Sequence, residues 1–159
     1  MTSSPGFQFT GVATLCLAVS WIESSSRSTS LKFRPVLIGL STPEDALAQI
    51  KEPCDLLFCV YVFEAFPSPE YGRRVLEVAA RLLRPGAMAL IQVKYSVGLT
   101  TRSRGWGYRF GVANMTTYRL DEFWKLSAEC GFTPHAIHLV PKSELVPDER
   151  YGYFVLKRN

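Results

Sequence analysis

Tyr61 and Glu64 are the side chains in this sequence best placed to meet a substrate, because they stand in and just after an apolar run, residues 55–63 (DLLFCVYVF). A run of this kind, without alternation, predicts a strand covered on both faces, as in a parallel sheet. Ligands bind outside the carboxyl ends of such strands. The ordinary alternatives are a core aromatic for Tyr61 and a solvated turn residue for Glu64, since unpaired buried carboxylates are rare.

Residues 96–117 form a glycine-containing stretch in which Arg102, Arg104 and Trp106 are candidate substrate-binding residues. Cations interleaved with aromatic rings can stack bases or grip phosphates, which would suit nucleic acid. A lid over an acidic substrate is equally consistent with these residue types, and a plain solvated loop is the ordinary alternative. The net charge of +4 permits nucleic-acid or anionic partners without requiring them.

The sequence does not predict a metal site. Four cysteines show no paired spacing: Cys16, Cys54, Cys59 and Cys130. This pattern argues against both metal ligation and a disulfide framework, and it predicts a reducing, cytoplasmic compartment. His135 and His138 lie three apart on a predicted strand, so we expect them to point to opposite faces and not to form a metal pair.

The chain of 159 residues, 47% of them apolar, is long enough for one domain with a core. No apolar run reaches the ~18 residues of a membrane span. The first 31 residues differ from the rest, with an apolar stretch at residues 12–22 (VATLCLAVSWI) followed by a serine-rich patch. Because no Lys or Arg precedes this stretch and no convincing cleavage site follows it, a secretory signal is not expected. A first strand or a poorly ordered leader is expected instead.

Regular elements are predicted from about Lys32 onward. Thr42 and Ser68 are the predicted N-caps of two helices, each followed by a proline at the first helical position. Gly86 is predicted to end the second helix in the left-handed conformation. Further elements are strands at residues 35–40, 55–63 and 87–95, a helix at 118–131 ending at Gly131, and two closing strands at 133–141 and 151–159. This order predicts an α/β fold with a mostly parallel sheet and one antiparallel edge strand.

Residues 55–93 (DLLFCVYVFEAFPSPEYGRRVLEVAARLLRPGAMALIQV) resemble the fourth strand, the following helix and the fifth strand of class I S-adenosylmethionine-dependent methyltransferases. Residues 120–132 (LDEFWKLSAECGF) are similar to a later helix of that family, and the closing strands to its terminal β-hairpin. The resemblance implies an incomplete Rossmann-like three-layer sandwich over residues 32–159. It also implies S-adenosylmethionine as cofactor and methyl transfer to an unknown acceptor.

By position, the resemblance implies cofactor contacts at Ser41 and Thr42 and at Cys59 and Val60, and substrate contacts at Tyr61 and Glu64. The family usually has an acid where Ser41 stands, and Ser41 can offer only a weaker, neutral hydrogen bond. Many relatives also have a histidine at the position of Ala65. The sequence therefore lacks one base that such enzymes could use.

The glycine-rich turn that holds the cofactor in this family has no counterpart, because residues 1–31 contain no G-x-G. This segment is also too short for the expected strand, helix and second strand, since one βαβ unit needs about 30 residues or more. We expect a truncated methyltransferase, a start read in a non-ancestral frame, or a smaller sheet in which residues 12–22 replace a strand. The alternative function is a non-catalytic module that binds a protein partner or nucleic acid through residues 102–110.

Overall fold

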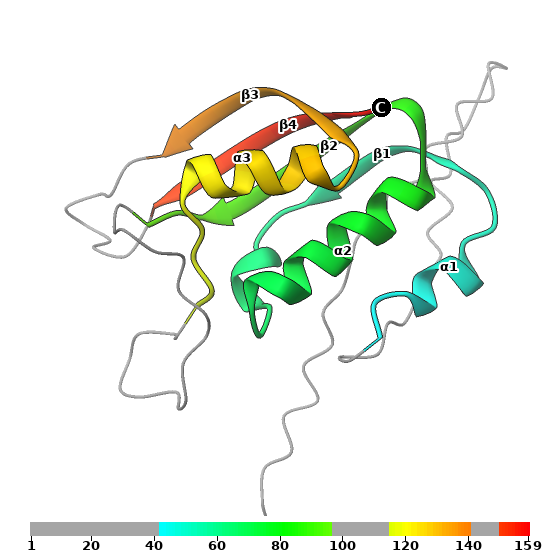
Figure 1. Ribbon diagram of the computed structural model, residues 1–159, viewed down its shortest axis with the longest axis horizontal. Helices are drawn as coiled ribbons and strands as arrows, with labels where there is room; N and C mark the ends of the chain where they lie inside the picture. Colours follow the sequence, from blue (N-terminus) through cyan, green and yellow to red (C-terminus); the bar gives the residue numbers. More distant parts are fainter. Residues whose placement is uncertain (1–41, 97–114, 141–149) are drawn as a thin grey trace, which may run out of the picture.

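The structure is a computed structural model that describes residues 42–96, 115–140 and 150–159. The expectations for residues 1–31, for the strand at 35–40 and for the Arg/aromatic stretch at 102–110 lie outside these residues. In chain order the elements are α1 (Asp45–Gln49), β1 (Cys54–Cys59), the short 3₁₀ helix η1 (Phe63–Ala65), α2 (Pro69–Leu82), β2 (Leu83–Lys94), α3 (Leu120–Glu129), β3 (Phe132–Val140) and β4 (Tyr151–Arg158) (Figure 1).

The described strands form one mixed sheet in the order β1-β2-β4-β3. β1 runs parallel to β2, while β4 is antiparallel to both β2 and β3. The predicted α/β class and the single reversed strand are confirmed. The expectation that this strand lies at an edge is wrong, because β4 sits between β2 and β3. Hydrophobic patterning identifies β4 as a strand, but its pairing with β2 depends on contacts far apart in the sequence.

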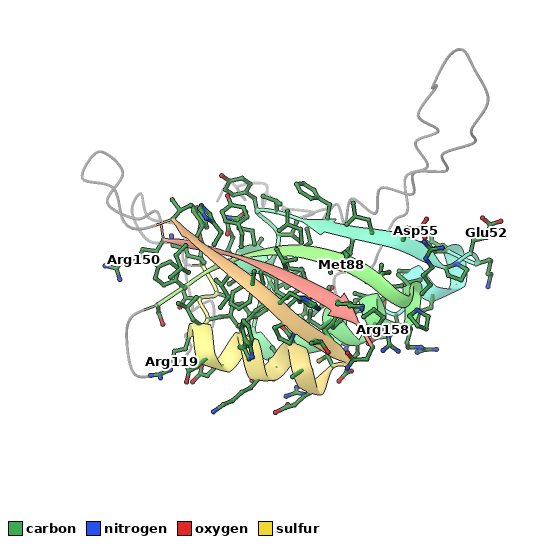
Figure 2. The ribbon with its side chains drawn as sticks, turned by 90° about the horizontal axis from the view of Figure 1, so that it is seen from above. Glu52, Asp55, Met88, Arg119, Arg150 and Arg158 are labelled. Carbon is green, nitrogen blue, oxygen red and sulfur yellow. The ribbon has the colours of Figure 1, made fainter. Side chains whose placement is uncertain are left out.

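Helices α2 and α3 both cover the same face of the sheet (Figure 2). Neighbouring strands supply that face with rows of buried side chains, one of which contains Cys59, Ile91 and Phe154. Helix α1 packs on α2 through Ala46 rather than on the opposite face. The described elements therefore make two layers, not the three expected.

Among the described elements, strand β1 is covered by helices on one face only, whereas the sequence predicts cover on both. Leu57 and Cys59 are each 1% exposed and face the helices, whereas Leu56 and Phe58 are 38% and 45% exposed. The sequence is apolar throughout because both sets of side chains are apolar, so it hides the alternation that the fold imposes. One face of the sheet thus carries apolar groups that no described helix covers.

Helix α2 begins as its sequence predicts. Ser68 is the N-cap and its Oγ accepts a hydrogen bond from the backbone N–H of Tyr71 at 3.3 Å, with Pro69 at the first position. The helix ends at Leu82, earlier than expected. Gly86 does adopt a left-handed φ of 84°, but it lies within the span of β2 rather than at the helix end. The chain leaves α2 already paired with β1, because Leu83 is in register with Cys54.

The other two helices differ in how well their ends are predicted. The N-cap of helix α1 is Glu44, whereas the sequence predicts Thr42. The Thr42 hydroxyl donates instead to the Asp45 carboxylate at 2.6 Å. Helix α3 stops at Glu129 and is followed by Gly131 at a φ of 91°, which confirms the predicted glycine ending. No helix within the described ranges combines the length and hydropathy that crossing a membrane requires.

Candidate functional site

Tyr61 follows β1 with a left-handed backbone, at a φ of 59°. A non-glycine residue in this conformation is strained and needs support from its surroundings. The support is Gln92, whose buried side-chain oxygen accepts the backbone N–H of Tyr61 at 2.7 Å. The ring is 60% exposed and packs edge-on against Tyr151, with 5.5 Å between centroids. Tyr61 is therefore not a core aromatic, and its ring is held out at the carboxyl end of β1.

Glu64 lies in η1 and is only 5% exposed, so the alternative of a solvated turn residue is wrong. Its backbone carbonyl accepts the N–H of Thr116 at 2.9 Å. The Thr116 hydroxyl in turn donates to the carbonyl of Phe66 at 2.7 Å. Thr116 therefore holds η1 in place through these two hydrogen bonds, and the Glu64 side chain is buried.

The carboxylate of Glu64 is in an unusual electrostatic position. Its Oε2 atom is buried and has no hydrogen-bond partner within the described part of the chain. Burial raises the pKa of Glu64, and the positive charge of Lys94 opposes that rise. Lys94 is itself 6% exposed, and its Nζ lies 3.5 Å from Met115 Sδ. A carboxyl group with a raised pKa can exchange protons nearer neutral pH than an exposed one.

Tyr61, Glu64, Gln92 and Lys94 together form what we call the polar cluster. Gln92 and Lys94 are two positions apart on β2, so they share one face of the sheet. Gln92 is fully buried, and its Nε2 has no hydrogen-bond partner among the described residues. The cluster therefore holds a buried acceptor at Glu64 and a buried donor at Gln92 that are both unsatisfied. Buried orphan groups of this kind call for a water, ion or ligand.

Two members of the polar cluster, Gln92 and Lys94, were not predicted from the sequence. The signal that could have found them is a glutamine and a lysine inside the otherwise apolar strand sequence AMALIQVKY. Polar side chains that are buried in a strand need a partner or a function. The neighbouring aromatic and apolar residues obscured this signal.

Of the predicted cofactor residues, only some lie near the polar cluster. Val60 is half-buried in the turn that leads to Tyr61, whereas the Cys59 thiol is buried on the helix-facing side of β1. Thr42 is exposed next to α1. The remaining candidates lie outside the described residues: Ser41, Arg102, Arg104 and Trp106. Their roles, and those of Thr42, Cys59 and Val60, stay predictions.

The two histidines follow a different geometry from the one expected. A shift of register between Pro134 and Ala136 places His135 in a bulge of β3, so simple alternation does not relate it to His138. Across the part of the chain that the structure describes, no group of three or more His, Cys, Asp or Glu residues could hold a metal ion.

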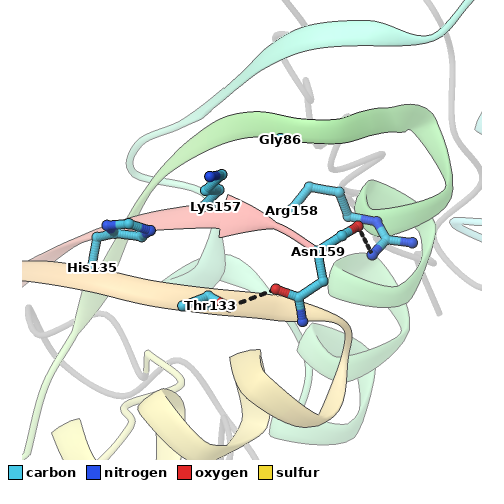
Figure 3. A pocket seen from close by; sticks show the side chains of 6 residues that line it. All are labelled: Gly86, Thr133, His135, Lys157, Arg158 and Asn159. Carbon is cyan, nitrogen blue, oxygen red and sulfur yellow. Dashed lines mark hydrogen bonds between the residues drawn. The ribbon is translucent and has the colours of Figure 1, made fainter.

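Figure 3 shows a hollow of about 410 Å³ beside the end of β4. Lys157 pairs with Met88 and Tyr153 with Gln92, so the hollow lies toward the other end of the sheet from the polar cluster. It is lined by Gly86, Thr133, His135, Lys157, Arg158 and Asn159. Although the lining is basic, the Arg158 guanidinium is engaged by the protein itself. Its Nε donates to the carbonyl of Ala80 at 2.6 Å and one terminal nitrogen donates to that of Gly131 at 3.0 Å. Arg158 therefore joins β4 to the ends of α2 and α3.

Comparison with solved structures identifies the fold. A SAM-dependent methyltransferase from Methanosarcina mazei superposes with a TM-score of 0.54 at 11% identity, over 83% of this chain and 72% of that one. The fold of the described residues resembles that of SAM-dependent methyltransferases. Magnesium protoporphyrin IX methyltransferase from Synechocystis, solved with bound SAH, gives 0.50 at 12% identity over 71% of this chain and 48% of that chain. A 1,6-didemethyltoxoflavin-N1-methyltransferase from Burkholderia thailandensis superposes with a TM-score of 0.50 at 17% identity. The match covers 67% of this chain and 44% of that chain.

These likenesses extend to structure and not to sequence. No protein-family profile and no curated protein matches the chain. This chain spans about half the length of the Synechocystis and Burkholderia structures. At such low identities the resemblance establishes the fold, and the chemistry has to be argued from the residues of this chain.

Proposed function

We propose that this chain binds S-adenosylmethionine and transfers its methyl group to an acceptor held over the carboxyl ends of β1 and β2. The observation that carries the proposal is the polar cluster, which lies at that edge of a sheet whose fold resembles a SAM-dependent methyltransferase. In open α/β sheets this edge is where ligands bind. The hollow lined by Lys157 and Arg158 lies at the other end and is not part of the proposal.

The residues present fit such a ligand in one respect. A bound molecule with a hydrogen-bond donor and an acceptor would satisfy Glu64 Oε2 and Gln92 Nε2, which have no partner in the described ranges. Unsatisfied buried groups each cost about 1–3 kcal/mol, so satisfying them favours binding. No glycine directly follows β1 or β2, so these turns lack the clearance with which a glycine lets a cofactor approach the backbone.

The cofactor, when bound, supplies a sulfonium methyl group that is open to attack by a nucleophile. The contribution of the protein is then to align the acceptor and to manage its proton. Glu64 accepts the proton that leaves the hydroxyl or N–H group being methylated, since a carboxylate with a raised pKa is a stronger base than an exposed one. The exposed ring of Tyr61, whose backbone N–H is held by Gln92, packs against the acceptor and excludes water from one side.

Calorimetric titration of the full chain with S-adenosylmethionine, and with S-adenosylhomocysteine, tests the proposal. We expect a dissociation constant in the micromolar range, that is a binding free energy near −8 kcal/mol. Absence of heat and of thermal stabilisation at roughly 1 mM ligand would refute cofactor binding, because a ligand at 100 times its dissociation constant stabilises by about 2.7 kcal/mol.

The role of Glu64 is tested separately. In an assay with a panel of hydroxyl and amine acceptors, Glu64→Gln should retain cofactor binding and lower the rate of methyl transfer by about 100-fold or more. Glu52→Gln, an exposed carboxylate near the amino end of β1, is the matched control and should leave the rate unchanged. Equal rates for Glu64→Gln and the unmodified chain would remove Glu64 from the mechanism while leaving the binding result intact.

A further inference from the structure

The face of the sheet opposite α2 and α3 carries a continuous apolar row across all four strands. Phe58 is in register with Leu90, Leu90 with Val155, and Val155 with Ala136. Residues paired in this way project their side chains to the same face. We call this row, with Leu56 and Met88 beside it, the open face.

The open face is not covered by any described helix, and two large apolar side chains at its β1 end are exposed. Phe58 is 45% and Leu56 38% exposed. The polar cluster borders the row along β2, because Gln92 and Lys94 follow Leu90 on the same side of that strand. Apolar patches that span several strands are uncommon on isolated domains and mark surfaces that receive another segment.

The sequence contains a segment with matching chemistry. Residues 12–22 (VATLCLAVSWI) have no charged side chain, and they are the longest such apolar stretch outside the described ranges. The 19 residues at positions 23–41 connect this segment to Thr42. Extended, they reach roughly 60 Å, whereas four strands at about 4.8 Å spacing span about 15 Å. The connection therefore does not limit access to the open face.

We propose that residues 12–22 of the same chain bind the open face of the sheet. A tethered segment acts at an effective concentration of about millimolar, which exceeds the concentration of a second copy in dilute solution. The segment is also apolar, as the row is, so contact removes both surfaces from water. This inference does not depend on methyl transfer and would hold for a chain that binds no cofactor.

Cys16 provides a native thiol for the test, since it lies inside the segment. The other three cysteines are buried, and burial raises the pKa of the Cys54 thiol and raises that of Cys130 to about 11. A second thiol is introduced on the open face by Leu56→Cys, Phe58→Cys or Met88→Cys, in separate full-length proteins. Lys125→Cys, exposed on α3 on the opposite side of the sheet, is the control.

A short bis-maleimide is added and the products are identified by peptide mapping. We expect an intramolecular Cys16 cross-link in at least one open-face variant, formed about tenfold faster or more than in Lys125→Cys and abolished by Cys16→Ser. Equal rates in the open-face and control variants would overturn the proposal, because they would indicate random collisions. Cross-linked dimers whose yield rises with protein concentration would also overturn it and would assign the open face to a second copy.

Discussion

Gly72 in α2 faces the hydroxyl group of Tyr118, and a Cβ atom added to Gly72 would overlap that oxygen. The Tyr118 hydroxyl is buried and has no hydrogen-bond partner among the described residues. Burial also raises the pKa of this phenol, so it stays protonated. The close approach of α2 to the segment that carries Tyr118 therefore depends on the absence of a side chain at position 72.

Gly72→Ala should destabilise the protein by about 1–3 kcal/mol through overpacking, although the same change in an exposed helix stabilises by about 0.5–1 kcal/mol. Tyr118→Phe removes the overlapping oxygen and should be nearly neutral, because that oxygen is unsatisfied. The double variant should recover part of the loss, since Tyr118 Cζ would still lie 3.3 Å from the new Cβ. Urea unfolding of the four proteins checks this, and strict additivity would contradict the contact.

Glu64 makes stability depend on pH in a direction that follows from its burial. Its pKa is raised above the ordinary value of 4.5, so folding favours the protonated carboxyl group. The stabilisation is complete below about pH 4.5 and is lost as the pH rises through the folded pKa. Above that pH the charged carboxylate is buried at a constant cost.

Glu64→Gln removes this titration. The unfolding free energy of Glu64→Gln, relative to the unmodified chain, should therefore increase between pH 4 and the folded pKa of Glu64 and then level off. Urea titrations at several values from about pH 4 to pH 8 measure the difference. The difference in unfolding free energy between the exposed variant Glu52→Gln and the unmodified chain should not change with pH. A difference for Glu64→Gln that is equally flat would mean that the Glu64 carboxylate is solvated.

At the scale of elements, Arg158 connects three of them. Its guanidinium reaches from the end of β4 to the carbonyl of Ala80 in α2 and to that of Gly131 after α3. Arg158→Ala should cost about 1–3 kcal/mol, because the Ala80 carbonyl loses its side-chain donor and the Gly131 carbonyl keeps only the N–H of Asn159. Lys157→Ala, one residue away and exposed, should change stability by no more than about 0.5 kcal/mol. Chemical denaturation compares the two, and similar losses would show that the guanidinium bonds contribute nothing.

How much of each element could be predicted depended on how local its cause is. The start of α2 was predictable because Ser68 and Pro69 act within one helical turn. Its end was not, because Leu83 already pairs with Cys54 on another strand. The open face was missed because its exposed side chains alternate along β1 with buried ones, and both sets are apolar. The sequence therefore shows no alternation there. Gln92 was missed because its partner, the N–H of Tyr61, is 31 residues away.

At the scale of the molecule, β2 and β4 are paired on both sides within the described sheet, whereas β3 is paired there only with β4. Amide exchange should therefore be slowest in β2 and β4 and approach the rate set by global unfolding. Outward-facing amides of β3 should exchange about tenfold faster or more. Exchange measured by NMR or mass spectrometry tests this, and equal protection of all four strands would require further pairing along β3.

The methyltransferase fold was predictable at this scale from the helix and strands of residues 55–93 and the later hairpin, since their order along the chain is distinctive. The position of β4 was not, because one pattern of alternating residues fits an edge strand and an interior strand alike. Of the polar cluster, only Tyr61 and Glu64 were candidates from the sequence, because their places after β1 follow from chain order. Their burial and exposure depend on Gln92 and Thr116 from distant segments.

The interior place of β4 also affects how the sheet is completed during synthesis. β3 emerges from the ribosome before β4, yet in the described sheet it reaches β2 only through β4. Until residues 151–158 are available, β2 and β3 each have an unpaired edge, and the aromatic side chains of the core lack the ring of Phe154. A nascent chain paused before Tyr151 should accordingly be a substrate for chaperones, and the last pairing event should close two interfaces at once.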